Sequence, residues 1–377
     1  MTANPLRALH EAGQSVWLDY IDRSLLQDGT LRRLIDDDAL RGMTSNPTIF
    51  EKALAEGGAY DSQISSLAGE LSAPELFELI ETDDVRSACD LFGNVYRTTT
   101  GQDGFVSIEV SPGKSNDAAA TIDEARRLWR TVGRPNVMVK VPGTSEGAQA
   151  IEHLIAEGVN VNVTLLFAID AHARVIDAYL AGLETRVRAG KAVDHVASVA
   201  SFFVSRVDTE VDKRLDAAAA GASGTLRDHL LSLRGRAAVA NTKRAYRLFQ
   251  ERFSGSRWEA LSARGARVQR PLWASTSTKN PAYRDVIYVE GLIGPQTVNT
   301  MPRATIDAFR DHGRVARTID ADVEAADQHI DMLAEAGLSF SDVTDKLLID
   351  GVAAFQKSFT SVVKGLGQKA ASLVATR

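Results

Sequence analysis

A lysine lies inside an apolar run that has the character of a buried strand. Lys140 occurs in the segment VMVKVP, which starts at Val137. Because strand side chains alternate between two faces, residues 138 and 140 point to one side and residues 139 and 141 to the other. An apolar interior favours the neutral form of an amine, and a neutral amine can attack a carbonyl carbon. The sequence therefore predicts a nucleophilic lysine at position 140; the alternative is a lysine that only pairs with a buried carboxylate.

Two acidic residues occupy comparable places in other apolar runs. Asp19 ends the run at 15–19 (SVWLD), and Glu109 lies near the end of the run at 105–110 (FVSIEV). Two carboxyl groups beside an amine can divide acid and base work, because the environment of each sets its proton affinity. The sequence leaves open whether Asp19 and Glu109 do so or only form ion pairs with Lys140.

Polar side chains also stand near the ends of other runs. Asn162 and Thr164 are two residues apart, so they project from the same face of a strand and suit a polyhydroxylated ligand. They also form a glycosylation sequon, which a buried strand would make ineffective. Ser201 ends a further run, and Phe203 follows it closely. These positions predict the wall of a ligand pocket.

The remaining candidates lie in loops. Thr44 and Asn46 belong to the segment TSNPT, which could serve a ligand or could simply cap the following helix. Arg206 and Lys279 follow two later runs, where many barrel enzymes bind phosphate. An isolated cation after a strand can equally well be solvated.

Short apolar runs alternate with helical patterns along the chain. This alternation indicates parallel strands joined by crossovers, and eight such runs favour an α/β fold with a closed (β/α)8 TIM barrel over an open doubly wound sheet. Functional groups in such barrels lie at the carboxyl ends of the strands. The expected strands are residues 15–19, 40–43, 105–110, 137–141, 159–164, 196–201, 271–275 and 286–289, and clear helical patterns cover 117–133, 146–157 and 168–189.

Two connections are longer than a barrel requires. Residues 51–104 and 208–270 carry additional helical patterns, which we interpret as helical insertions rather than separate domains. After residue 302 come three amphipathic stretches at 303–313, 322–337 and 341–371. One should be the final barrel helix, and the last could close over an end of the barrel. We therefore expect a single domain over 1–377 with a C-terminal helical extension at 303–377.

Composition narrows the class of protein. The 377 residues are 44% hydrophobic and 24% charged, as in ordinary globular proteins, and the net charge of −6 disfavours nucleic-acid binding. Cys89 is the single cysteine, so an intrachain disulfide is impossible and a reducing compartment is favoured. The sequence has no signal-peptide pattern and no apolar run long enough to span a bilayer. These features predict a cytoplasmic protein without membrane partners.

Motifs for common cofactors are incomplete. The segment Gly113-Lys114-Ser115 resembles the end of a phosphate-binding loop, but Ile108 stands where the first glycine is required. No G-x-G-x-x-G follows a predicted strand, and the seven histidines lack the spacing of metal ligands. We therefore expect no metal and no cofactor.

Several separated segments resemble those of the transaldolase family. They occur in the family's order from about Asp19 to Pro302, and the long last segment is similar to that of the larger bacterial members. The segments are GMTSNPTIFEKAL from Gly42, VSIEVSP from Val106, VMVKVPGT from Val137, GVNVNVTLLF from Gly158, SFFVSRVD from Ser201 and WASTSTKNPAYRDVIYVEGLIGPQTVNTMP from Trp273.

This resemblance implies a metal-free Schiff-base mechanism on a (β/α)8 barrel, with Lys140 on the fourth strand as the nucleophile. It also implies that Glu109 and Thr164 handle a water and protons, and that Asp19 takes the proton of the C4 hydroxyl. The implied substrate-binding residues are Thr44, Asn46, Asn162, Ser201, Phe203, Arg206 and Lys279. Lys279 is a departure, because many members have an arginine after the seventh strand.

The function that the resemblance implies is a transaldolase of the pentose phosphate pathway. Such an enzyme moves dihydroxyacetone from sedoheptulose 7-phosphate to glyceraldehyde 3-phosphate, giving erythrose 4-phosphate and fructose 6-phosphate. The partners would be phosphorylated ketoses and aldoses, and the oligomeric state is left open. The rivals are an aldolase that releases free dihydroxyacetone and a sugar-phosphate-binding protein without catalysis.

Overall fold

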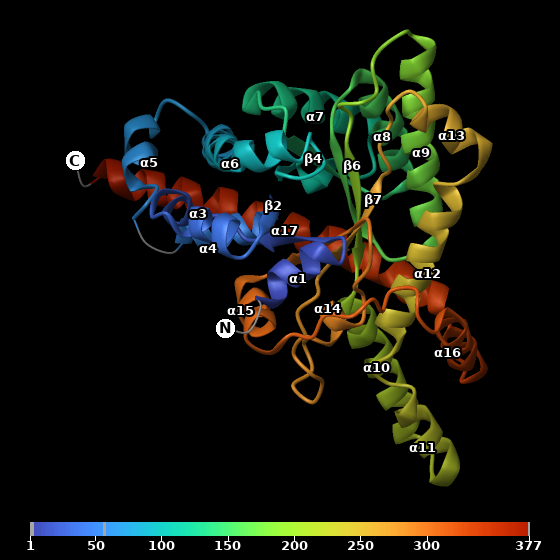
Figure 1. Cartoon of the computed structure of the whole chain (residues 1–377). Helices are drawn as coiled ribbons and strands as arrows, with labels where there is room; N and C mark the ends of the chain where they lie inside the picture. Colours follow the sequence, from blue (N-terminus) through green and yellow to red (C-terminus); the bar gives the residue numbers. More distant parts are fainter. Residues whose placement is uncertain (1–3, 56–57, 376–377) are drawn as a thin grey trace.

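Eight parallel strands close into a barrel, in the same order in space as in the sequence (Figure 1). The structure is a computed structural model that describes residues 4–55 and 58–375. The predicted α/β barrel is thereby confirmed. The strands are β1 (Gln14–Asp19), β2 (Leu40–Thr44), β3 (Phe105–Glu109), β4 (Val137–Pro142), β5 (Val161–Leu166), β6 (Ser198–Phe203), β7 (Arg270–Ala274) and β8 (Thr297–Met301).

The eighth strand was predicted at the wrong place. The apolar run at 286–289 belongs largely to a short helix, α14 (Ile287–Glu290), and the barrel closes through β8 instead. A four-residue apolar run cannot be assigned by periodicity, and β8 is inconspicuous because three of the five residues in its sequence, TVNTM, are polar. Two of its buried side-chain oxygens are bonded: Gln14 Nε2 donates to Thr297 Oγ1 at 3.0 Å, and Thr276 Oγ1 donates to Asn299 Oδ1 at 2.8 Å.

Helices surround the barrel where the sequence predicts them. Asp117 accepts a hydrogen bond from Ala120 N and so caps the first turn of α7, and Gly133 ends that helix in the left-handed region at φ 61°. Thr144 caps α8 in the same way. The helices that precede the sixth strand are α1 (Pro5–Glu11), α2 (Arg23–Gln27), α3 (Thr30–Asp37), α4 (Pro47–Ala55), α5 (Asp61–Leu67), α6 (Ala73–Thr98), the 3-10 turn η1 (Pro112–Lys114), α7 (Ala118–Val132), α8 (Ser145–Glu157) and α9 (Ile169–Arg188).

Both long connections are helical. The first contains α4, α5 and α6, of which α6 packs against β3 and α7. The second contains α10 (Ser205–Ala220), α11 (Gly224–Ser232), α12 (Ala237–Arg252) and α13 (Gly255–Ser262), and α10 and α11 project together as an arm at the bottom of Figure 1. Within the described residues, no helix is long and apolar enough to cross a membrane.

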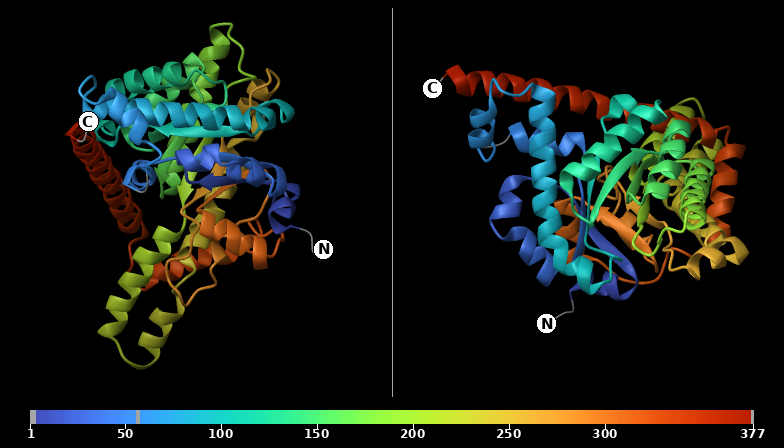
Figure 2. Two further views of the ribbon diagram at one scale, coloured as in Figure 1. Left: turned by 90° about the vertical axis from the view of Figure 1, so that its left-hand side faces the viewer. Right: turned by 90° about the horizontal axis from the view of Figure 1, so that it is seen from above.

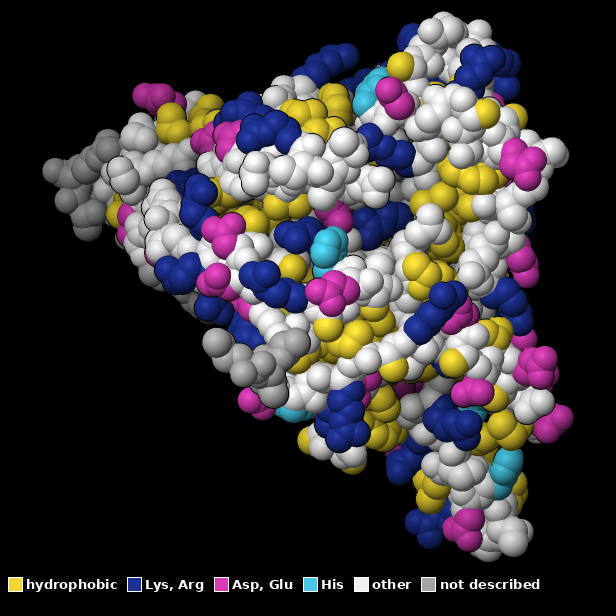
Figure 3. Space-filling view, in the orientation of Figure 1, with side chains coloured by type: hydrophobic (Ala, Val, Ile, Leu, Met, Phe, Trp, Pro, Cys, Tyr) yellow, Lys and Arg dark blue, Asp and Glu magenta, His cyan; other side chains and the backbone are white. Residues whose placement is uncertain are grey.

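The last helix runs across the molecule. After α15 (Arg303–His312) and α16 (Val323–Glu335), α17 (Phe340–Ala375) packs on α10 at one end and on α4, α5 and α6 at the other (Figure 2). It also contacts β5, so it lies over the carboxyl ends of the strands, as the sequence suggested. On the face shown in Figure 3, basic and acidic side chains are interspersed.

A close approach between β1 and β2 makes one glycine necessary. Gly42 stands opposite Trp17 in the ladder, and a Cβ at position 42 would lie 2.5 Å from the indole ring. We predict that Gly42→Ala lowers the free energy of unfolding by about 1–3 kcal/mol, the usual cost of overpacking. Urea unfolding measures this difference.

Gly93→Ala is the control for this substitution. Gly93 lies within α6, and a methyl group at this position would meet no atom within 4 Å outside its own helix backbone and chain neighbours. Because alanine restricts the unfolded chain and suits a helix, this variant should gain roughly 0.5–1 kcal/mol. Equal effects at the two positions would show that the Trp17 contact does not constrain Gly42.

Candidate active site

A cavity of about 390 Å³ opens at the carboxyl ends of the barrel strands. Glu109 and Asn162 lie directly behind its wall and are bonded to residues that line it or neighbour it. The other predicted site residues are brought together in the wall itself: Asp19, Thr44, Asn46, Lys140, Thr164, Ser201, Phe203, Arg206 and Lys279.

Lys140 is buried in contact with a carboxylate. Its side chain is 6% exposed, and Nζ lies 3.0 Å from Glu109 Oε2 and donates to the carbonyl oxygen of Ser45 at 2.9 Å. Strand register explains the pairing, because Lys140 and Glu109 stand opposite each other in the β3–β4 ladder. Burial raises the pKa of Glu109, and the charge of Lys140 opposes that rise. The ion pair foreseen as the alternative is therefore present, in a place where it could also exchange a proton.

Asp19 stands on the opposite side of the cavity. Its Oδ1 accepts a hydrogen bond from Thr44 Oγ1 at 2.8 Å, and Thr44 Oγ1 also lies 2.8 Å from Thr300 Oγ1. Although Asp19 reaches the cavity surface, burial among protein atoms raises its pKa, and the charge of Lys140 is the largest influence against that rise. The two carboxyl groups thus have different partners, which is what division of acid and base work requires.

A polar network beneath Lys140 fixes the orientation of one amide. Asn162 Nδ2 donates to Ser107 Oγ at 2.9 Å, and Ser201 Oγ donates to Asn162 Oδ1 at 2.7 Å. Asn162 is fully buried, so glycosylation of the folded chain at the sequon is sterically impossible.

Thr164 presents an unused hydroxyl beside this network. Its Oγ1 has no hydrogen-bond partner among the described residues. The next residue, Leu165, has φ 59°, and the β5–β6 register shifts between Val163 and Leu166. Left-handed backbone at a non-glycine residue is unfavourable, and such strain is concentrated at functional sites. Because Thr164 Oγ1 has no partner here, its hydroxyl is available to a water or a substrate.

Three cations gather on one side of the cavity. Arg206, in the first turn of α10, packs its guanidinium 5.0 Å from the centre of the Phe203 ring and has no ion-pair partner among the described residues. Lys279 Nζ donates to Ser277 Oγ at 2.7 Å. Burial lowers the pKa of Lys279, and the neighbouring Arg206 lowers it further. Lys52 on α4 completes the group.

Sequence reasoning missed several residues of this cavity. Lys52 could have been found, because Thr48, Ile49 and Lys52 share one face of α4 and follow directly after the Thr44–Asn46 loop. Phe355 on α17, whose ring centre lies 5.8 Å from Lys140 Nζ, had no signal near the strands. Asn46 has the capping role that was foreseen as the alternative, because its Oδ1 accepts from Ile49 N at 3.1 Å, although it also lines the cavity.

The other candidate motifs have structural roles. Lys114 lies 3.4 Å from Glu124 in an ion pair. Burial lowers the pKa of His172 to about 3 and that of His329 to about 4, as for histidines packed in apolar surroundings. The described residues contain no group of three or more histidine, cysteine or acidic side chains that could hold a metal ion.

The raised pKa of Asp19 makes a prediction about stability. A carboxyl whose pKa is higher in the folded chain than in the unfolded chain destabilises the fold at pH values above its ordinary range. We expect Asp19→Asn to be more stable than the wild type at pH 7, and this advantage to shrink as the pH falls. Urea midpoints at several pH values measure it. A variant that is less stable at pH 7 would mean that attraction to the cations outweighs burial.

Comparison with known proteins agrees with this geometry. The family model described as transaldolase/fructose-6-phosphate aldolase matches residues 16–366. A protein named transaldolase from Thermobifida fusca (strain YX) is 47% identical, with 98% of this chain and 99% of the relative covered. Proteins of the same name from Trichodesmium erythraeum (strain IMS101) and Mycolicibacterium paratuberculosis (strain ATCC BAA-968 / K-10) are 42% and 48% identical, with 97% or more of each chain covered. This chain therefore belongs to the transaldolase/fructose-6-phosphate aldolase family.

Proposed function

We propose that this enzyme is a transaldolase that carries a three-carbon unit on Lys140. The observation that supports this proposal above all is the buried contact of Lys140 with Glu109, at the bottom of a cavity lined with hydroxyl groups and cations. The reaction would move dihydroxyacetone reversibly from sedoheptulose 7-phosphate to glyceraldehyde 3-phosphate, giving erythrose 4-phosphate and fructose 6-phosphate. It would take place in the cytoplasm, in a single-domain chain.

Imine formation needs a neutral amine and a proton for the leaving hydroxyl. Glu109, 3.0 Å from Lys140 Nζ, takes a proton from the ammonium group and later returns it to the C2 hydroxyl, which leaves as water. The unused hydroxyl of Thr164 holds that water. Ser45 keeps Lys140 in place through its carbonyl oxygen, 2.9 Å from Nζ.

Cleavage of the C3–C4 bond needs a base and an electron sink. Asp19 takes the proton of the C4 hydroxyl, and the bonding electrons move into the protonated imine, leaving an enamine on Lys140. Its raised pKa makes Asp19 a stronger base than an exposed aspartate. Thr44, Asn46, Asn162 and Ser201 hold the hydroxyl groups of the bound unit.

Binding of the phosphate group is assigned to the three cations. Arg206 can form two parallel hydrogen bonds to phosphate oxygens, and Lys279 and Lys52 add charge without this geometry. Two rings, Phe203 and Phe355, limit the access of water to Lys140. Exclusion of water favours transfer to an acceptor aldehyde over release of free dihydroxyacetone, the aldolase alternative.

Borohydride reduction of the imine tests the nucleophile and the base together. With fructose 6-phosphate and EDTA, the wild type should carry a three-carbon adduct on Lys140, located by intact mass and peptide mapping. Asp19→Asn should instead accumulate an uncleaved six-carbon adduct, because its imine forms but the C3–C4 bond remains. Lys140→Met, which has no amine to form an imine, is the negative control.

Either part of this test can fail. If the wild type is not trapped where a known imine-forming aldolase is, a binding protein becomes the better interpretation. A three-carbon adduct at the wild-type rate in Asp19→Asn would remove Asp19 from the role of base.

Arg206→Ala should weaken the recognition of phosphate. We expect the KM for fructose 6-phosphate to rise about 10- to 100-fold, as for loss of a charge-assisted contact of roughly 1.5–3 kcal/mol. With dihydroxyacetone as donor the change should be less than about twofold, because this donor carries no phosphate. Steady-state kinetics with a common acceptor compare the two. Equal changes would mean that Arg206 does not bind the donor phosphate.

A further inference from the structure

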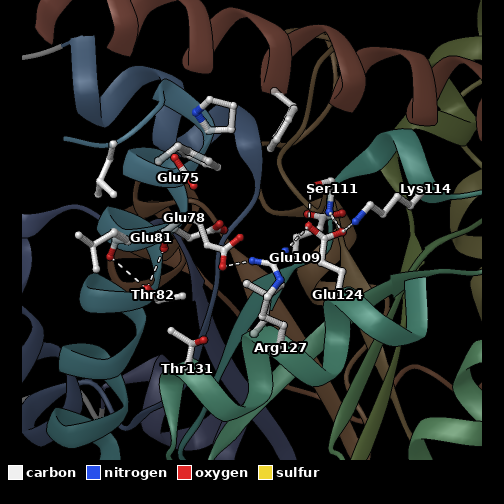
Figure 4. Close-up of a pocket in the computed structure, with 16 residues that line it drawn as sticks. Glu75, Glu78, Glu81, Thr82, Glu109, Ser111, Lys114, Glu124, Arg127 and Thr131 are labelled. Carbon is white, nitrogen blue, oxygen red and sulfur yellow. Dashed lines mark hydrogen bonds and ion pairs between the residues drawn. The ribbon is translucent and has the colours of Figure 1, made fainter. Parts of the chain in front are cut away.

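A second cavity lies beside the barrel, with Glu109 in its wall (Figure 4). Lys140, which Glu109 contacts, lines the cavity at the carboxyl ends of the strands, here called the sugar pocket. It has a volume of about 750 Å³ and lies between α6, α7 and α17. Exposed side chains such as Glu75, Arg127 and Thr131 form its rim, and the buried carboxyls of Glu81 and Glu109 belong to its inner wall. The cavity therefore leads from solvent to the carboxyl group that contacts Lys140.

Glu81 is the unexplained group of this cavity. It is 6% exposed and has no hydrogen-bond or ion-pair partner within residues 4–55 and 58–375. The other acidic side chains of the wall are all bonded. Glu75 accepts from Ser72, and Glu78 pairs with Arg127. Glu109 pairs with Lys140, and Glu124 accepts from Ser111 and pairs with Lys114.

An isolated buried carboxylate is too costly to remain ionised. Burial raises the pKa of Glu81 well above its ordinary value, and the negative charge of Glu109 raises it further. Glu109 is in a different position, because Lys140 supplies an adjacent positive charge. The two carboxyls therefore differ in what opposes the rise of the pKa: Glu109 has a cation in direct contact, whereas Glu81 has none within the described chain.

The contents of the cavity follow from its lining. Among the described residues no group of ligands suits a metal ion, and both nearby cations, Lys114 and Arg127, already have acidic partners. The lining is mixed, with apolar side chains such as Phe77, Leu128 and Phe359 beside the glutamates. Water suits the part that the glutamates line, where it supplies the hydrogen-bond partners that the buried acid lacks.

We propose that this cavity is a second port of the active site, through which water and protons reach Glu109, and that Glu81 is the positioning residue that holds a proton there. The inference rests on the imine chemistry proposed for Lys140. A phosphorylated sugar fills the barrel mouth during the reaction, and α17 with Phe355 covers it. The side cavity gives water a path that the sugar does not block.

The chemistry needs such a path in both directions. The Lys140 ammonium gives one proton to Glu109, and the amine adds to C2. A second ammonium proton moves to the C2 oxygen, Glu109 returns the first, and the C2–O bond breaks to release water and the protonated imine. Hydrolysis reverses these steps with a new water molecule. In its acid form Glu81 donates to the cavity water next to Glu109 and so keeps Glu109 in proton exchange with solvent.

Oxygen exchange follows these steps directly. In water enriched in ¹⁸O, each cycle of imine formation and hydrolysis replaces the C2 oxygen of fructose 6-phosphate, which mass spectrometry detects after subtraction of the uncatalysed rate. We expect Glu81→Ala to exchange oxygen about tenfold more slowly, part of the ~10²–10⁴ that a positioned acid–base group contributes. The KM for the sugar should be unchanged, because Glu81 lies outside the sugar pocket.

Formate distinguishes a proton-holding role from a structural one. It should enter the space left in Glu81→Ala and restore exchange in proportion to its concentration. Glu81→Gln keeps the shape of the side chain but cannot exchange a proton, so it should be slow and should not respond to formate. Asp83→Asn is the matched control on α6, outside the cavity, and should behave as the wild type.

The outcomes separate this inference from the proposed function. Wild-type exchange in Glu81→Gln, or a slow but folded Glu81→Ala that formate does not restore, would overturn the role of Glu81. Failure of borohydride to trap the wild type would count against the imine mechanism itself. Thermal unfolding of each variant verifies that it is folded.

Discussion

Lys140 and Glu109 lie on adjacent strands with their charged atoms 3.0 Å apart, and both are nearly inaccessible to solvent. Burial of two charges costs several kcal/mol each unless they are close together and further bonded. The parallel register of β3 and β4 meets the first condition, and the carbonyl oxygen of Ser45 contributes to the second. The β2–α4 loop that carries Ser45, the strand pairing and the barrel closure are therefore all needed to keep one amine in place.

Charge is distributed unevenly around this pair. Arg206, Lys279 and Lys52 stand on the side where a sugar phosphate would enter, whereas Glu81 and Glu124 lie behind Glu109, outside the barrel. An anionic substrate is attracted to the first side, which alone has cations without acidic partners among the described residues, while water and protons can pass on either. The sugar pocket is thus suited to the anionic substrate and the side cavity to water and protons. Lys140 and Glu109 lie in the wall between them.

The sequence predicted those residues of the site that a pattern of neighbouring residues indicates. Strand ends could be predicted, because the alternation of apolar runs and helices located Asp19, Glu109, Lys140 and Thr164 without any tertiary information. Thr300, which bonds to Thr44, was missed because the eighth strand was predicted at 286–289. Residue 300 was therefore not expected to lie near the end of a strand. Correct placement of β8 would have identified Thr300 by the same rule.

Other parts of the site could not be found in this way. Phe355 reaches Lys140 from a helix at the other end of the chain, and the carbonyl oxygen of Ser45 has no side-chain signature. Glu81 has the spacing of an ordinary helical residue in α6, and its isolation is visible only when α7 and α17 are packed around it. Packing decides whether a carboxyl is solvated, paired or isolated, and therefore whether it holds a proton at neutral pH. In this chain one helix and one strand supply glutamates of identical chemistry, and their surroundings alone place Glu109 in contact with Lys140 and leave Glu81 without a bonding partner among the described residues.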